Sequence, residues 1–239
     1  MQRVQALQPG DGQAREEFCR WILRRVSDNP DFLINVLWTD EATFTRHGVI
    51  NTRNLHHWSL ENPRTIRQSR FQVEFSINVW AGIVGDHLIG PYELPGRLNS
   101  ERYLEFLQTT LPTLLEDVPF NIRAAMWFQH DGAPPHFGRQ VRSWLNQRYR
   151  DRLIGRGGPV SWPPRSPDLN PLDFYLWGHM KGLVYATEVT TRDELLDRIH
   201  EAAAAIHHTP EQLGRVRSSL LRRAETCLRV QGAHIEHLL

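Results

Sequence analysis

The sequence predicts a mixed α/β domain in which short strands alternate with amphipathic helices. The apolar run from Phe32 to Trp38 is typical of a buried central strand, and we expect this strand to end at Asp40. Residues 73–84 and 87–94 are predicted as two more strands, because Gly85-Asp86 between them is a two-residue hairpin signal. Helical stripes of apolar residues fill most of the remaining chain.

The first helix is predicted over residues 14–26, which are amphipathic at helical spacing. A second helix is predicted to begin at Asn99-Ser100, a favourable N-cap, and Pro112 should break or kink it. Four leucines form its apolar stripe: Leu104, Leu107, Leu111 and Leu114.

Residues 124–128 are predicted as another buried strand, which leads to Asp131. The helix expected after it contains apolar residues at positions 141, 144, 145 and 149, behind Arg139 and Arg142. Asn170-Pro171 is typical of an N-cap followed by proline at the first helical position. The helix it begins would carry Asp173, with one stripe formed by Leu172, Leu176 and Leu183.

Two more helices should close the chain, because each begins with a capping-box pattern. Thr191 pairs with Glu194 in the first, and Thr209 pairs with Gln212 in the second. We therefore expect a lead-in helix in residues 1–30, a main α/β domain in residues 31–185 with an insert loop at 45–71, and C-terminal helices in residues 186–239 packing on that domain.

Composition is that of an ordinary globular protein, with 40% hydrophobic and 23% charged residues and a net charge of +1. No run approaches the roughly 18 apolar residues of a membrane span. Cys19 and Cys227 have no zinc-ligand spacing, which disfavours a structural zinc site and suits a reducing compartment. Between Arg139 and Arg156 there are six arginines and one acidic residue, Asp151, so this segment could contact phosphates or form a solvated helix face.

Three aspartates occupy distinctive local sequences: Asp40 in LWTDEATF, Asp131 in WFQHDGAPPHF and Asp173 in SPDLNPLDFYLW. Each alone has a structural explanation, as the end of a strand, a turn before Gly132, or a carboxylate in a first helical turn. Together, three carboxylates held at the ends of rigid elements could bind hard divalent cations. A pair of such ions is a common device for attack on a phosphodiester.

These segments resemble the catalytic domain of mariner-type (Tc/mariner superfamily) transposases. The matching residues are Thr39-Asp40-Glu41, the run HDGAPPH from His130 to His136, and the run SPDLNPLD from Ser166 to Asp173, preceded by Trp162-Pro163-Pro164. The chain departs from many relatives at Gly132, where they have asparagine, and in the 41 residues between its second and third aspartates.

The resemblance implies a ribonuclease-H-like fold, an α/β domain with a central mixed sheet flanked by helices and with extra C-terminal helices. It also implies DNA cleavage and strand transfer with Mg²⁺, or Mn²⁺ as a substitute, two ions to a site. Asp40 and Asp131 would hold the first ion and Asp173 would complete the second site. Glu41 is a candidate for supporting these ligands, His136 for reaching a ligand or a DNA phosphate, and Arg139 and Arg142 for contacting DNA; the alternative for Glu41 and His136 is that both are ordinary surface residues.

Further expectations follow from the resemblance. The partners would be transposon ends and target DNA, the chain would be a homodimer on DNA, and it would act in the nucleus, with no membrane and no small-molecule cofactor. The insert at 45–71 would reach toward the partner subunit and the DNA, or it would be an ordinary surface loop. The lead-in residues offer one helix, so we expect no helix-turn-helix for recognising DNA ends.

Alternatives remain open at this point. A host-adopted, catalytically silent DNA-binding or scaffold domain could keep the fold, and a cellular ribonuclease or resolvase would use similar carboxylates. Asp168 lies only five residues before Asp173, and we expect it to stabilise the turn before the helix. On that view Asp168→Asn would cost at most about 1 kcal/mol of stability.

Overall fold

The computed structural model describes residues 6–46, 48 and 75–238. Nearly all of the predicted insert at 45–71 therefore lies outside the described residues, and so does the beginning of the second predicted strand. No helix in the described part of the chain is long and apolar enough to cross a bilayer.

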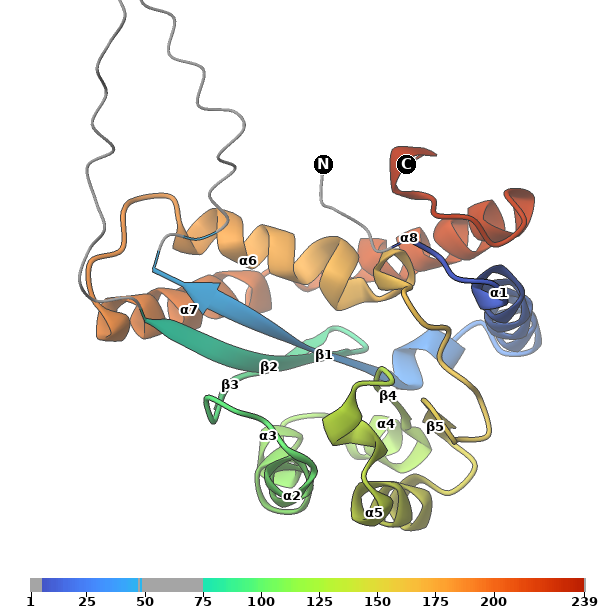
Figure 1. Ribbon diagram of the computed structural model, residues 1–239, viewed down its shortest axis with the longest axis horizontal. Helices are drawn as coiled ribbons and strands as arrows, with labels where there is room; N and C mark the ends of the chain where they lie inside the picture. The colour runs from blue at the N-terminus through green and yellow to red at the C-terminus, as the bar shows by residue number, and fades with distance from the viewer. Residues whose placement is uncertain (1–5, 47, 49–74, 239) are drawn as a thin grey trace, which may run out of the picture.

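A five-stranded mixed sheet forms the centre of the fold, in the order β3-β2-β1-β4-β5 (Figure 1). The strands β1, β2 and β3 are antiparallel neighbours, whereas β4 and β5 run parallel to β1. Their bounds are β1 Val36–Thr45, β2 Ser76–Val84, β3 His87–Leu94, β4 Trp127–Gln129 and β5 Leu153–Ile154. The predicted hairpin is confirmed, since β2 ends and β3 begins on either side of Gly85-Asp86.

Helices cover both faces of the sheet, and Figure 1 shows one set above it and one below. The upper set comprises α1 (Asp11–Asp28), α6 (Trp177–Val184), α7 (Arg192–His207) and α8 (Pro210–Arg229). The lower set comprises α2 (Ser100–Glu105), α3 (Leu111–Leu114), α4 (Phe120–Ala125) and α5 (Arg139–Tyr149). Each face has its own cluster of buried apolar residues, so the domain has the three-layer arrangement expected of a sheet with helices on both sides.

Alternation along β1 assigns its side chains to these two layers. Val36 and Trp38 are buried in the upper cluster, and Leu37 between them is buried in the lower one. Successive side chains of a strand point to opposite faces. Continuing the alternation, Asp40 faces the layer that contains α6, and Glu41 faces the layer that contains α2 and α5.

The helix beginning at Ser100 has the predicted cap and a π-helical turn in its middle. The side chain of Asn99 accepts a hydrogen bond of 2.9 Å from the backbone N–H of Arg102. A π-helical segment, Phe106–Thr110, then separates α2 from α3, in which Pro112 occupies the first turn. Proline lacks an N–H and clashes with the preceding turn of a regular helix, and the wider turn accommodates it.

A second π-helical turn, Leu172–Leu176, precedes α6 and corrects the predicted leucine stripe. Leu172 and Leu176 are buried as expected, but Leu183 is 42% exposed. A π turn contains more residues than an α turn, so the positions after it are rotated about the helix axis. Val184 therefore takes the buried position that regular α-helical spacing would have given to Leu183.

Other boundaries differ in instructive ways. The expected end of the first strand at Asp40 is wrong, because β1 continues to Thr45 through backbone pairing with β2. Ala124 and Ala125 belong to α4 rather than to the following strand. Thr191 caps α7 by accepting from the N–H of Glu194, as predicted. The equivalent cap on α8 does not form, because the Thr209 hydroxyl instead donates to the carbonyl of Ile206.

Candidate active site

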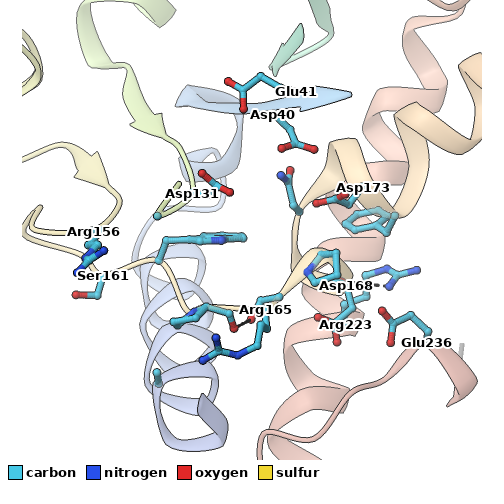
Figure 2. A pocket seen from close by; sticks show the side chains of 18 of the residues that line it. Asp40, Glu41, Asp131, Arg156, Ser161, Arg165, Asp168, Asp173, Arg223 and Glu236 are labelled. Atoms are coloured by element: carbon cyan, nitrogen blue, oxygen red, sulfur yellow. Dashed lines mark hydrogen bonds between the residues drawn. The ribbon is translucent and has the colours of Figure 1, made fainter. Parts of the chain in front are cut away.

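A pocket of about 990 Å³ lies where β1 extends past β4, and all three predicted aspartates line it (Figure 2). The strand β4 pairs with β1 only at Val36 and Leu37, so the rest of β1 has no paired strand on that side among the described residues. Crevices at the carboxyl ends of strands are the usual ligand sites of open α/β sheets. Asp40, Asp131 and Asp173 thus converge from β1, from the end of β4 and from the π turn before α6.

Asp40 is fixed on the α6 side of the strand by a tryptophan. The indole Nε1 of Trp177 donates a hydrogen bond of 2.7 Å to Oδ2 of Asp40. Burial raises the pKa of Asp40 well above its usual range, and the nearby carboxylates of Asp173 and Glu41 raise it further. The hydrogen bond from Trp177 lowers this pKa and so partly offsets the cost of a buried charge.

Asp131 follows β4 by two residues, and its hydrogen bonds to the described residues both end on a single oxygen. Its Oδ1 accepts from the backbone N–H of Ala133 at 2.9 Å and lies 2.7 Å from Nδ1 of His136. Burial raises the pKa of Asp131, but the hydrogen bond and positive charge of His136 outweigh this, and the net shift is downward. The second oxygen, Oδ2, accepts no hydrogen bond from the described residues and is left for a ligand.

His136 joins two acidic side chains and is itself buried. Its Nε2 lies 3.2 Å from Oε1 of Glu41, opposite the contact between its Nδ1 and Asp131. Burial lowers the pKa of His136, but Glu41 and Asp131 outweigh that effect and raise the pKa to about 10. The side chain is therefore an imidazolium at neutral pH. The sequence singles out Glu41 and His136 as supports for the carboxylates. The structure places His136 in contact with both Asp131 and Glu41.

Two more rings fix the position of the imidazolium. The Tyr103 ring centre lies 4.3 Å from that of His136, and the His130 ring stacks on it at 5.0 Å with an interplanar angle of 14°. Burial and the charge of His136 lower the pKa of His130 to about 3, so His130 is neutral. A Cβ at Gly155 would lie 2.5 Å from the His130 ring, so a glycine there permits this close packing. Sequence reasoning identified neither ring.

The pKa of the third aspartate, Asp173, is raised by its surroundings. Burial and the charge of Asp131 raise its pKa to about 7, while Lys181 opposes the shift. Three partly buried carboxylates that repel one another, with oxygen atoms facing a pocket, are the donor set that hard divalent cations prefer. The residues present therefore fit a divalent metal site, although the oxygens of the three aspartates do not all lie within 4.8 Å of one another.

A different trio does lie within that distance, namely Asp168, His234 and Glu236. Asp168 is a poor ligand, because Arg15 donates to both of its oxygens at 2.7 and 2.5 Å and the backbone N–H of Ile235 adds a third bond. Both charged side chains are fully buried. Asp168 thus joins α1 and the C-terminal segment to the loop before Asp173. Asp168 does lie in the turn before the helix, as expected, but its buried ion pair with Arg15 gives it a larger structural role than that of a turn residue.

The two arginines predicted to contact DNA, Arg139 and Arg142, are not among the residues that line the pocket. Arg139 is exposed at the start of α5 and does not line the pocket. Arg142 lies with its guanidinium carbon 4.3 Å from the ring centre of Phe137. Three other arginines, which were not singled out, line the pocket: Arg156, Arg165 and Arg223.

Comparisons with known proteins bear on what this pocket is. No protein-family model matches the chain. The chain is 22% identical to the Tcb1 transposase of Caenorhabditis briggsae over 232 residues, which is 91% of this chain and 76% of that protein. It is 26% identical to the Tc1 transposase of Caenorhabditis elegans over 71% of this chain and 59% of that protein. The sequence relatives of this chain are thus transposases of the Tc1/mariner kind.

Solved structures agree with this relationship. The crystal structure of the catalytic domain of Mos1 mariner transposase matches with a TM-score of 0.74 and 21% identity, over 98% of this chain and 100% of that domain. A Mos1 paired-end complex with the left transposon end matches with a TM-score of 0.76 and 23% identity, over 99% of this chain and 68% of the Mos1 chain. The predicted ribonuclease-H-like fold is confirmed, since the fold of this chain matches the Mos1 catalytic domain over the whole length of that domain.

Proposed function

We propose that this chain is a transposase catalytic domain that performs metal-dependent DNA strand cleavage and strand transfer. The observation that carries the proposal is the convergence of Asp40, Asp131 and Asp173 in one pocket of a fold shared with the Mos1 catalytic domain. Mos1 catalytic domain structures contain Mn or Mg, which supports the use of divalent cations by a homologue.

The carboxylates of Asp40, Asp131 and Asp173 would hold two Mg²⁺ ions, with Asp40 and Asp131 on the first and Asp173 completing the second. Such ions supply the Lewis acidity that activates a water or a 3′ hydroxyl and stabilises the departing oxygen. Trp177 and His136 each engage one oxygen of an aspartate, which fixes the direction of the other oxygen toward the pocket. Attack by water gives strand cleavage and attack by a 3′ hydroxyl gives joining, so one pocket serves both reactions.

The proposed partners are transposon ends and target DNA, by analogy with the Mos1 paired-end complexes. We further propose that the chain acts as a homodimer on DNA and works in the nucleus. Because it corresponds to 76%, 59% and 44% of the lengths of three curated relatives, these are proposals about a whole protein of that kind.

The test is nicking of supercoiled plasmid in Mg²⁺ or Mn²⁺, followed by joining of a 3′-hydroxyl oligonucleotide to plasmid. We expect wild type to nick, and we expect Asp40→Ala, Asp131→Ala and Asp173→Asn to be silent while melting as folded proteins. Joining by wild type supports a transposase, whereas nicking without joining would indicate a nuclease. A folded wild-type chain that binds DNA but never nicks it would indicate a catalytically silent DNA-binding domain.

A further inference from the structure

Three arginines line the pocket, and two of them are already engaged by the protein. Arg165 forms an ion pair with Asp11. Arg223 donates a hydrogen bond of 3.1 Å to the carbonyl of Asp168 and stacks on the ring of Phe174. Arg156 differs, because it has no hydrogen bond or ion pair to the described residues, and its guanidinium carbon lies 4.1 Å from the centre of the Phe137 ring.

The same ring carries a second free cation. The guanidinium carbon of Arg142 lies 4.3 Å from the centre of Phe137, and Arg142 has no hydrogen bond or ion pair to the residues that the structure describes. Its Nε is buried without a partner. Two like charges sharing one ring repel each other, and no carboxylate among the described residues neutralises either of them. An anion bound between them would relieve this repulsion.

The backbone holds the two arginines together beside the pocket, which Arg156 lines and Arg142 does not. Gly157 follows Arg156 with φ of +80°, a conformation that residues with a side chain rarely adopt. A Cβ at Gly157 would lie 3.4 Å from the Phe137 ring and 3.7 Å from Cδ of Arg142, so this loop lies directly against both. Stacking on an aromatic face orders a guanidinium before any ligand binds, which lowers the entropic cost of binding.

The position of the pair suits a nucleic-acid backbone. Figure 2 shows Arg156 on the Asp131 side of the pocket and Arg223 on the Asp173 side. A DNA strand carries a charge about every 3.4 Å along the helix axis. A strand whose reacting phosphate lay among the aspartates would therefore carry neighbouring phosphates along the pocket wall.

We propose that Arg142 and Arg156, ordered on Phe137, form a phosphate clamp that binds the DNA backbone beside Asp131. This inference rests on the proposed function, because it takes DNA to be the substrate. The guanidinium fork is suited to phosphate oxygens, and charge-assisted hydrogen bonds of this kind are among the stronger polar contacts in proteins.

The test compares two double variants that remove the same charge from the same segment. Arg142→Gln/Arg156→Gln removes the clamp, and Arg148→Gln/Arg150→Gln removes two exposed arginines that do not line the pocket. Binding of a short fluorescein-labelled duplex of arbitrary sequence is measured by anisotropy across a range of salt concentrations, without divalent cations. Thermal melts establish that each variant is folded.

We expect the clamp variant to lose about tenfold in affinity for each arginine, and its salt slope to fall by about one for each. The matched control should lose less than about threefold. The single variant Arg156→Gln provides a second reading, since this exposed side chain can be replaced without unfolding the chain. Equal losses in both double variants, or no loss in either, would overturn the clamp while leaving the proposed function intact. Failure of the wild-type chain to bind DNA at low salt would overturn both.

Discussion

The indole N–H of Trp177 donates to Oδ2 of Asp40 across 137 residues of sequence, at a distance of 2.7 Å. This bond joins the helix that follows Asp173 to the strand that carries Asp40, so two of the three aspartates are positioned relative to each other by one side chain. We expect Trp177→Phe to keep most of the packing and to lose the donor. A hydrogen bond to a charged group is worth about 1.5–3 kcal/mol, and urea unfolding should show a loss of that order.

If Trp177 had a purely structural role, its replacement would change stability alone. The pH profile of Mn²⁺-dependent nicking is therefore the more informative measurement. Without Trp177 the pKa of Asp40 rises further, and the rising limb of the profile should move to higher pH. The matched control is Trp38→Phe, because the Trp38 indole N–H is buried without a partner among the described residues. An unmoved profile for Trp177→Phe would show that the bond does not tune Asp40.

The second prediction concerns repulsion within the triad. The charge of Asp173 raises the pKa of Asp40, and burial and the charge of Asp131 raise the pKa of Asp173, so replacing Asp173 with asparagine should stabilise the metal-free chain while abolishing nicking. Thermal melts in EDTA and in Mg²⁺ measure both effects. Wild type should gain stability from Mg²⁺ through preferential binding to the folded state, and Asp173→Asn should gain much less. If both proteins gained equally, the metal would be bound somewhere other than at this pocket.

Much of this fold could be predicted from local sequence, since the hairpin at Gly85-Asp86 and the caps at Asn99 and Thr191 are short-range signals. The exposure of Leu183 could not, because a π turn leaves no mark in apolar periodicity. The end of β1 was wrongly predicted at Asp40 for a related reason, because the residue at which a strand ends depends on the strands that pair with it. The pocket opens beside β1 because β4 is short, and this length cannot be inferred from the sequence of β1.

The candidate site shows the same division between local and long-range information. The three aspartates could be identified from sequence motifs, but not all of the side chains that contact them could be. His136 lies five residues from Asp131 and could be inferred from the sequence. Trp177 shares a helical face with Asp173, yet its partner is Asp40, on another element. Arg156 gave no signal beyond belonging to an arginine-rich segment, because its contact with Phe137 arises from the loop around Gly157.

The third prediction separates Asp168 from Asp173. Asp168 forms a fully buried ion pair with Arg15, and removing one partner would leave an uncompensated charge in the interior. Asp168→Asn should therefore cost about 3–5 kcal/mol in urea unfolding rather than the 1 kcal/mol of a turn residue. The control is Asp86→Asn, which breaks an ion pair with Arg217 in which the aspartate is 58% exposed, and it should cost less than about 1 kcal/mol.

The nicking activity of this variant distinguishes the two aspartates. Asp168→Asn lies outside the proposed metal ligands, so the fraction that remains folded at low temperature should still nick plasmid in Mn²⁺. A folded but silent Asp168→Asn protein beside an active Asp173→Asn protein would mean that the third ligand is Asp168, five residues before the one we assign.

The last prediction concerns pH. In the metal-free protein the pKa of Asp173 is raised to about 7, whereas an unfolded aspartate titrates near 3.9. Between these values the folded state binds more protons than the unfolded state, so this group makes stability fall as pH rises through that window. Divalent cations bind the ionised carboxylate, and the stabilisation they give should therefore grow over the same window. Melts from pH 5 to pH 8 with and without Mg²⁺ should diverge as pH rises, and Asp173→Asn should lose most of that divergence. Parallel curves for wild type would mean that Asp173 is already ionised at pH 5 and that its repulsion by Asp131 is weaker than its position implies.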